Sequence, residues 1–278
     1  MENINIKEIL DYFKSGKFDI AKKETALLIK KFPNNHFLYN LFGAILAGQK
    51  KMDEAIIYYE KSIKISPNYA DAYNNLAGIL AEQKKYNKAI EYLENRVVEV
   101  NNSKARELIW FLEHPSVYTA GSSFNKNDIL DDSINLIKTK RGGKITWHGP
   151  GQLVCYFVIN LNNRKRDIRN FISLIENSII ESLKEYKIKS QSDKKNIGIW
   201  VKSKNKIKKI AAIGIRIKRW IAYHGFSINI DNDLNNYNKI IPCGIKDKEV
   251  TNLISIKKQN YQNLSEKILN NLINNLKI

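Results

Sequence analysis

The residues with the clearest chemical potential are two cysteines and one lysine. Cys243 lies between Pro242 and Gly244, which predicts a turn where a thiol can meet a substrate, whereas Cys155 alternates with apolar residues and is expected inside a strand. A free thiol has a pKa of about 8.5, so a nucleophilic cysteine needs a neighbouring base. Lys209 opens an apolar run, where loss of water favours the neutral amine, and is the candidate base. Residue types alone leave open a buried structural Cys243 and a solvated Lys209.

A glycine-rich stretch, Arg141–Gln152, has the sequence Arg-Gly-Gly-Lys-Ile-Thr-Trp-His-Gly-Pro-Gly-Gln. Its adjacent glycines permit close approach of the backbone to a ligand, and its Gly-Pro-Gly predicts a tight turn. The stretch lacks the spacings of the dinucleotide-binding and P-loop motifs. Arg141 is a candidate for holding a carbonyl or a phosphate, or is a surface arginine. Thr146 and His148 share strand parity and are expected to point into one pocket, although a structural role for His148 is the alternative.

Short apolar runs that position these residues begin at about residue 108. The alternation of residues 152–161 predicts a strand buried on both faces, and apolar residues at helical spacing predict an amphipathic helix over 168–186. Further strands are expected over 108–112, 210–217 and 222–230, and a closing helix over 261–276. Strands and helices mix without strict alternation, so the expected fold class is α+β.

The first third of the chain contains an internal repeat with a period of 34 residues. Matching pairs at this shift are Pro33 and Pro67, Tyr39 and Tyr73, Ile45 and Ile79, Leu46 and Leu80, Ala47 and Ala81, Gln49 and Gln83, Ala55 and Ala89, and Tyr58 and Tyr92. The period resembles the tetratricopeptide repeat, a helix pair that buries its apolar face by stacking on neighbours. A degenerate repeat at 17–21 precedes two clear ones. The array either binds an unknown protein or packs against the rest of the chain.

Length and composition indicate two domains: tetratricopeptide-like repeats over 1–85, whose last helix extends to about residue 100, and a catalytic domain over 86–278. The net charge is +18, of which residues 1–85 carry +3 and residues 86–278 carry +15. This excess predicts a negatively charged partner or a solvated lysine face. No apolar stretch is long enough to span a bilayer and no signal peptide is apparent, so the expected location is cytoplasmic. Two cysteines without zinc-ligand spacing predict no disulfide framework and no metal site.

The glycine-rich stretch resembles the RGGxxTYHGPGQ signature of the octanoyltransferases of lipoate biosynthesis. Segments similar to the family's other motifs lie along the chain in the expected order: Leu112–Gly121 before this stretch, and Gly198–Val201, Lys209–Arg216, Tyr223–Gly225 and Pro242–Gly244 after it. The departures are Trp147 for tyrosine, Lys140 where aspartate often precedes RGG, Phe226-Ser227 after the histidine-glycine pair, and a longer lysine-rich loop before Lys209. That loop leaves Lys208 as a rival for the role of Lys209.

The resemblance implies a mixed-sheet catalytic domain of the lipoate and biotin protein ligase type. The implied reaction moves octanoyl from octanoyl-acyl carrier protein to a lysine of lipoyl domains, in 2-oxoacid dehydrogenase E2 subunits and glycine cleavage H protein, with no cofactor, ATP or metal. Cys243 would form the octanoyl thioester and Lys209 would assist proton transfer. The implied substrate-binding residues, whose backbone would line the acyl channel, are Arg141, Gly142, Gly143, Lys144, Ile145, Thr146, Trp147, His148, Ala212, Ile213, Gly214, Gly225, Phe226 and Ser227.

Three other functions are consistent with parts of the sequence. The closest is an ATP-dependent lipoate or biotin protein ligase, which shares the fold but activates a free acid and requires no cysteine equivalent to Cys243. A repeat-based protein-binding adaptor with an inactive transferase domain is another, although the intact Cys243 and Lys209 argue against it. A basic nucleic-acid binder is the third, but no motif supports it, and no interaction with nucleic acid or a membrane is expected.

Overall fold

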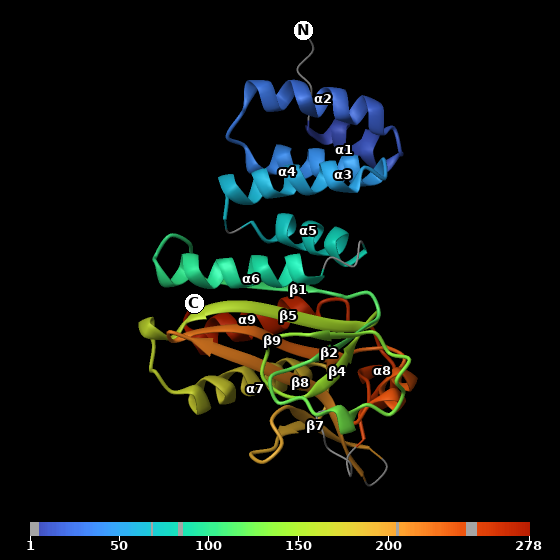
Figure 1. Ribbon diagram of the computed structural model, residues 1–278, viewed down its shortest axis with the longest axis vertical. Coiled ribbons are helices and arrows are strands. Elements are labelled where there is room, and N and C mark those ends of the chain that lie inside the picture. The colour runs from blue at the N-terminus through green and yellow to red at the C-terminus, as the bar shows by residue number, and fades with distance from the viewer. Residues whose placement is uncertain (1–5, 68, 83–85, 204–205, 243–248) are drawn as a thin grey trace. The chain divides into compact units, whose positions relative to one another are not determined.

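The computed structural model of the chain describes residues 6–67, 69–82, 86–203, 206–242 and 249–278. The chain divides into two compact units, Met1–Ala89 and Ile90–Ile278 (Figure 1). The first unit is helical, and all the strands of the described residues belong to the second. The division falls within helix α6, Tyr86–Asn101, the helix expected to complete the repeats.

The first unit consists of helix pairs joined by short turns. Its helices before α6 are α1 (Ile6–Lys14), α2 (Phe18–Lys31), α3 (His36–Gly48), α4 (Met52–Ile65) and α5 (Ala70–Glu82). Ala21 and Ala55, which are 34 residues apart, have no exposed surface. The ring of Tyr59 lies so close to Gly43 that a Cβ there would come within 2.7 Å of it. Small residues therefore allow neighbouring helices to approach closely, as the repeat pattern predicts.

The second unit contains two sheets. A six-stranded antiparallel sheet has the order β1-β5-β9-β8-β7-β6, and a three-stranded mixed sheet has the order β3-β2-β4, in which β2 pairs parallel with β3 and antiparallel with β4. The strands of the large sheet are β1 (Leu108–Leu112), β5 (Gln152–Asn160), β6 (Ser190–Ser192), β7 (Ile199–Ser203), β8 (Lys206–Lys218) and β9 (Ile221–Asn229). Those of the small sheet are β2 (Val117–Ala120), β3 (Leu136–Lys138) and β4 (Ile145–His148).

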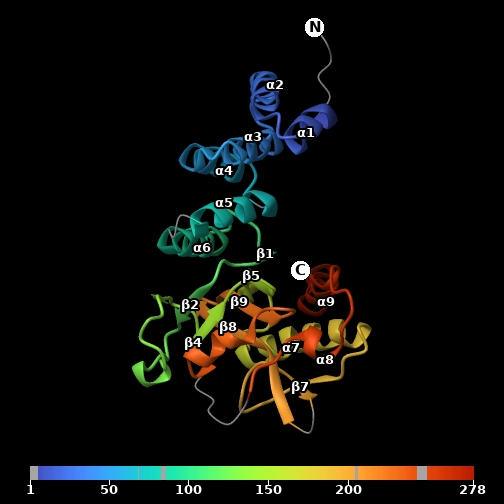
Figure 2. The same cartoon turned by 90° about the vertical axis from the view of Figure 1, so that its right-hand side faces the viewer.

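Helices cover one face of the large sheet. The main ones are α7 (Ile168–Glu185) and α9 (Leu264–Leu276), with the short α8 (Leu253–Ile256) and the 3-10 turns η1 (Lys126–Asp128), η2 (Leu161–Asn163) and η3 (Leu234–Lys239) in the connections. In Figure 2, α7 and α9 lie on one side of the large sheet, and β2 and β4 of the small sheet lie on the other. The helix-covered face and the opposite face of the large sheet therefore have different neighbours.

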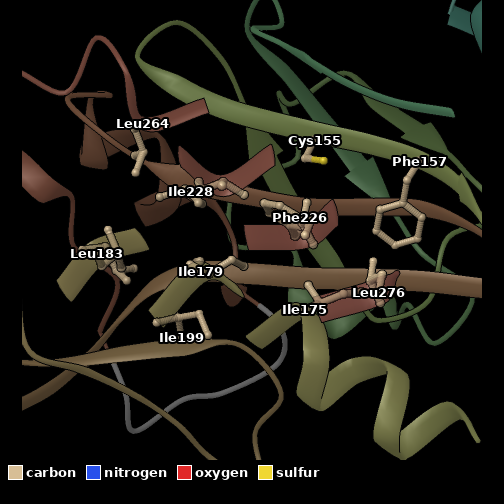
Figure 3. Packing of buried hydrophobic residues seen from close by; sticks show 14 of the residues in the cluster. Cys155, Phe157, Ile175, Ile179, Leu183, Ile199, Phe226, Ile228, Leu264 and Leu276 are labelled. Carbon is tan, nitrogen blue, oxygen red and sulfur yellow. The ribbon is translucent and has the colours of Figure 1, made fainter. Parts of the chain in front are cut away.

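The hydrophobic core lies between the large sheet and helices α7 and α9. Cys155 and Phe226, from paired strands, lie in it together with Ile175 and Ile179 of α7 and Leu264 of α9 (Figure 3). All five side chains are 3% exposed or less. The apolar periodicity of the sequence therefore identified the surfaces that meet in this core.

The strands and helices expected from the sequence are present with small shifts at their ends. The predicted strand over 152–161 ends at Asn160 because η2 begins at the next residue, and the predicted helix over 261–276 begins at Leu264. Strand β8 is longer than the predicted 210–217, because the lysine-rich segment before it also pairs with β7. The mixed α+β class is confirmed. None of the helices that the structure describes is long and apolar enough to cross a membrane.

Candidate active site

A β-bulge between β7 and β8 determines which way Lys209 points. Ile199 pairs with Ala211, and both lie in the core, but the next pair is Trp200 with Lys209, so Ile210 is an extra residue in β8. Successive residues of a regular strand point to opposite faces, which would place Lys209 on the core face with Ala211. The extra residue reverses this parity. Lys209 therefore lies with Trp200 on the face opposite the core.

The side chain of Lys209 occupies a buried position on this face. It is 6% exposed. Its Nζ donates a hydrogen bond of 3.1 Å to the carbonyl oxygen of Ile197 and lies 4.8 Å from the centre of the Trp200 ring. In the described part of the chain Lys209 forms no ion pair, whereas its neighbour Lys208 pairs with Glu249 at 2.5 Å. The two lysines therefore have different surroundings: Lys209 is buried without an ion pair among the described residues, and Lys208 is paired with a carboxylate.

The segment that follows residue 248 is attached to the backbone of Lys209. The amide of Lys209 donates to the carbonyl of Glu249, and the amide of Thr251 donates to the carbonyl of Lys209, each at 2.9 Å. The Glu249 carboxylate also pairs with Lys206 and Lys208, both at 2.5 Å. Residue 249 follows Cys243 by six positions, so the chain on the C-terminal side of this cysteine is attached beside the candidate base. Cys243 itself lies outside the described residues.

The Arg-Gly-Gly segment lies flat against the large sheet. The Arg141 guanidinium donates to the Thr119 carbonyl at 2.8 Å, to the Thr119 hydroxyl and to the Gly142 carbonyl. A Cβ at Gly142 would lie 2.5 Å from the Ile215 carbonyl oxygen, so only glycine permits this approach of the segment to β8. Arg141 is half-buried, and its described contacts hold the segment to β2. Arg141 is therefore not a fully exposed side chain, and its role toward a substrate stays a prediction.

A buried amide, Gln152, links the end of β4 to the end of β9. Its Nε2 donates to Asn229 Oδ1 and to the Tyr237 hydroxyl, both at 2.8 Å. Asn229 in turn donates to the carbonyl of Thr251 at 2.9 Å, the residue that is hydrogen-bonded to Lys209. This network connects the glycine-rich stretch to Lys209 through buried polar groups. Such networks hold side chains rigidly because every broken bond leaves a buried polar atom unpaired.

His148 and His114 form a second polar cluster on this face. His148 Nδ1 lies 2.6 Å from Gln152 Oε1, and His114 Nε2 lies 2.9 Å from the Tyr156 hydroxyl. Because Oε1 of Gln152 can only accept, Nδ1 of His148 donates, and Nε2 of the neutral ring keeps its lone pair. Burial, with His114 and Arg141 nearby, lowers the pKa of His148 to about 3, and burial lowers that of His114 to about 4. Both rings are neutral near pH 7. Burial raises the pKa of Tyr156 to about 12.

The expected substrate-binding residues divide into two groups. Trp147 lies in the core of the small sheet and donates to Ser116, while Phe226 lies in the main core, so only their backbones remain for a substrate. Ile145 is fully buried and Ile213 packs against the main core. By strand alternation, the opposite face carries Ala212, Gly214, Gly225 and Ser227. Thr146 and His148 are both buried in β4, Gly143 has a positive φ, and Lys144 pairs with Asp128.

Several residues of this region were not identified as site residues from the sequence. His114 and Gln152 stood inside quoted motifs without an assigned role, and Tyr156, Asn229 and Tyr237 had none. The sequence offered one indication of these residues, because Tyr156 and Asn229 carry polar groups within strands made mainly of apolar residues. A buried hydrogen-bonding group in a strand requires a partner, but only the fold shows which one.

Comparison with known proteins assigns the residues described above to a catalytic domain. Residues 85–272 match the lipoyl protein ligase A/B catalytic domain, and residues 36–95 match the tetratricopeptide repeat. The octanoyltransferase of Bartonella bacilliformis is 44% identical over 171 residues, covering 58% of this chain and 71% of that protein. The octanoyltransferase of Anaplasma phagocytophilum is 46% identical over 167 residues, covering 59% and 80%.

Solved structures share the fold at low sequence identity. Lipoate-protein ligase A bound with ATP is 16% identical, with a TM-score of 0.51, covering 62% of this chain and 74% of that one. A bipartite lipoate protein ligase from Thermoplasma acidophilum, studied with its E2 lipoyl domain, is 13% identical, with a TM-score of 0.54, covering 69% and 80%. Since the catalytic-domain match spans most of the chain, the chain belongs to the lipoyl protein ligase A/B catalytic domain family.

Proposed function

We propose that this octanoyltransferase takes its acyl group from octanoyl-acyl carrier protein and delivers it to a lysine of lipoyl domains, through a thioester on Cys243. Transfer of octanoyl in protein lipoylation is the activity named for its relatives. The observation that carries the proposal is the buried Lys209, which lies on the face of the sheet opposite the core and whose backbone is hydrogen-bonded to residues 249 and 251, shortly after Cys243. The acceptors are the lipoyl domains of 2-oxoacid dehydrogenase E2 subunits and of glycine cleavage H protein.

In the first half-reaction the Cys243 thiol gives its proton to Lys209, and the thiolate attacks the carbonyl carbon of the donor thioester. The carbon–sulfur bond to the donor breaks, and its thiol leaves with the proton held by Lys209. In the second half-reaction the amine of the acceptor lysine attacks the octanoyl-Cys243 thioester. Lys209 accepts a proton from this amine and returns one to Cys243, so an amide forms and the free enzyme is restored.

The surroundings of Lys209 suit a group that exchanges protons. Its Nζ is held in place by a hydrogen bond to the Ile197 carbonyl and by the Trp200 ring, and the side chain is almost completely screened from water. Cys155 is unsuited to the nucleophilic role, because burial raises its thiol pKa well above the ordinary value and leaves the side chain without exposed surface. The donor thioester is already activated, so the proposed reaction needs no ATP.

We further propose that the chain consists of a repeat domain over 1–85 and a catalytic domain over 86–278. The compact units meet at Ala89, and the catalytic-domain match begins at residue 85, which supports a boundary in this region. The backbone of Gly225 is proposed for substrate binding because Gly225 pairs with Gly214 on the face of the large sheet opposite the core. Arg141 is proposed because its side chain lies close to Gly214, and His148 because its ring lies 5.9 Å from that of His114. The repeats offer a surface for an unknown protein.

The test is intact mass after the protein is mixed with octanoyl-acyl carrier protein in the absence of ATP. We expect one added octanoyl group, labile to hydroxylamine, at Cys243. Cys155→Ser is the matched control and should acquire the same group, whereas Cys243→Ser should acquire none. Acylation at Cys155, or turnover that survives Cys243→Ala, would contradict the proposal, and activity that requires ATP and free octanoic acid would favour a ligase.

A further inference from the structure

His224, in the middle of β9, has a backbone conformation that is unusual for a strand. Its φ is +70°, a strained value for a residue other than glycine. Its ring stacks on that of Tyr223, with 4.8 Å between ring centres and 25° between planes. Adjacent residues of a regular strand point to opposite faces, so this stacking indicates that the strained backbone turns the His224 ring toward the face of Tyr223. That face is the one opposite the helix-covered core.

The ring of His224 is buried and has an unpaired nitrogen. The residue is 4% exposed, and its Nε2 has no hydrogen-bond partner within the described residues. Burial, together with Arg141, Arg216 and Lys140, lowers the pKa of His224 to about 3, so the ring is neutral. Buried polar atoms without a hydrogen-bond partner are rare in folded proteins, and strained backbone conformations cluster at functional sites. An unpaired buried nitrogen on a strained residue is therefore typical of a binding site.

The nearby cations restrict the chemistry of a ligand at this nitrogen. Arg141 donates a hydrogen bond to the Gly142 carbonyl, and Arg216 donates one to the Lys140 carbonyl. Both guanidinium groups are cations close enough to His224 to act on its ring. A neutral imidazole can donate or accept a hydrogen bond, but the positive surroundings oppose a cationic ligand. The site therefore disfavours a cation and suits a neutral or negatively charged oxygen, of which a hydroxyl oxygen is one.

The position of His224 along the sheet relates it to the reacting end of the substrate. His224 pairs with Ile215, which follows Lys209 by six residues in β8, so the two sites are roughly 20 Å apart along the strand. An extended carbon chain advances about 1.25 Å per bond, so a lysine side chain and an octanoyl chain laid end to end span about 15 Å, and a contact of about 3 Å at each end brings this to the separation of the two sites. An acyl chain whose carbonyl lies at Lys209 and which follows Ser227 and Gly225 ends near His224.

We propose that Nε2 of His224 is a hydrogen-bonding subsite for a polar atom at the far end of the acyl chain, so that the enzyme transfers 8-hydroxyoctanoyl groups as well as octanoyl. The inference rests on the proposed function, because it places the acyl carbonyl at Lys209. The covalent chemistry is unchanged: the terminal hydroxyl takes no part in the breaking or forming of bonds. His224 is thus a residue that determines acyl-chain specificity.

The test compares octanoyl, 8-hydroxyoctanoyl and 8-aminooctanoyl groups on the same acyl carrier protein. In the wild-type enzyme, kcat/KM for the hydroxylated donor should lie within about threefold of that for octanoyl, and the cationic amino donor should be at least about tenfold poorer. His224→Gly relieves the backbone strain and removes the ring. It should lower kcat/KM for the hydroxylated donor about tenfold relative to octanoyl, while His224→Asn, which also tolerates positive φ, should retain part of the preference.

The octanoyl measurement separates this inference from the proposed function. If the wild-type enzyme fails to transfer octanoyl, the proposed function is overturned, and the subsite with it. If it transfers octanoyl but rejects 8-hydroxyoctanoyl more than tenfold, or if His224→Gly slows both donors equally, His224 has only a structural role and the subsite alone is overturned. Should His224→Gly fail to fold, the three donors compared on the wild-type enzyme decide the question by themselves.

Discussion

At the scale of single residues, the contrast between Lys209 and Lys208 gives a direct test of the proposed base. Lys209 is buried beside Trp200, whereas Lys208 pairs with the exposed carboxylate of Glu249, and exposed ion pairs contribute little to stability. We expect Lys209→Met to lower kcat at least about a thousandfold. Lys208→Met should change kcat by less than about threefold. Equal losses in the two variants, measured with octanoyl-acyl carrier protein, would assign both lysines to structure.

The buried histidines predict how stability depends on pH. His114, His148 and His224 have pKa values of about 4, 3 and 3, lowered mainly by burial, against about 6.5 in an unfolded chain. Between these values the unfolded state binds more protons than the folded state, so the free energy of unfolding falls as the pH is lowered from about 6.5 toward 3. Below about pH 3 the loss from the histidines levels off, while protonation of carboxylates with lowered pKa values, such as Asp131, lowers the free energy of unfolding further.

The measurement is denaturant unfolding at a series of pH values, followed by tryptophan fluorescence, because all four tryptophans belong to the catalytic unit. His148→Gln can keep the hydrogen bond to Gln152 while removing one titrating group. It should therefore give a shallower dependence on pH between 6.5 and 4, with little difference in slope above pH 7. An unchanged acid slope would show that His148 is protonated equally in the folded and unfolded states.

At the scale of elements, the pairing of β5 with β9 depends on one glycine. A Cβ at Gly225 would lie 1.8 Å from the carbonyl oxygen of Cys155, which is backbone and cannot rotate away. Gly225→Ala should therefore destabilise the catalytic unit by about 3 kcal/mol, the upper range for overpacking. The control is Gly78→Ala in α5, where no atom lies within 4 Å of the new Cβ and helix propensity should add about 1 kcal/mol.

Unfolding of these two variants is measured in different ways, because the substitutions lie in different units. Tryptophan fluorescence reports the catalytic unit, and helical circular dichroism includes the repeats. A catalytic unit that keeps its stability in Gly225→Ala would mean that β5 and β9 separate readily at this point, and that the close approach carries little energy.

The sequence predicts these elements well where periodicity decides them. Alternation identified β5 and the burial of Cys155, and the 34-residue period located the buried Ala21 and Ala55. Alternation could not predict the orientation of Lys209. A single extra residue at Ile210 reverses the alternation of side chains between the two faces of the sheet, and no residue type is specific to such a bulge. The positive φ of His224 was equally hidden, since it depends on the surrounding fold.

Long-range polar partners were also outside the reach of the sequence. Gln152 meets Tyr237, 85 residues away, and His114 meets Tyr156. Any buried polar group needs such a partner, but the residue that supplies it depends on how β4, β9 and η3 converge. The family motifs compensated for this in part, because they named Arg141, His148 and Lys209 together before any of their contacts was known.

At the scale of the whole molecule, the uneven charge distribution predicts how the donor is recognised. Residues 86–278 carry +15 of the net +18, and the donor that we propose, acyl carrier protein, is acidic. Attraction between exposed charges is screened over about 10 Å at ~0.1 M salt and acts mainly on the rate of encounter. Added salt should therefore lower kcat/KM for octanoyl-acyl carrier protein several-fold and leave kcat nearly unchanged.

Two controls separate docking of the donor protein from chemistry at the site. A small neutral octanoyl thioester presents no acidic surface, so its rate of acylating the enzyme should scarcely respond to salt. Lys22 and Lys23 are half-buried and exposed residues of α2. A variant with serine at both positions should keep the salt response to the protein donor, because residues 1–85 carry a net charge of only +3. If both donors respond equally to salt, the basic excess is a solvated lysine face and the donor is recognised through its acyl group and uncharged contacts. If the α2 variant abolishes the response, the repeats themselves attract the donor, and the array has a role in substrate capture.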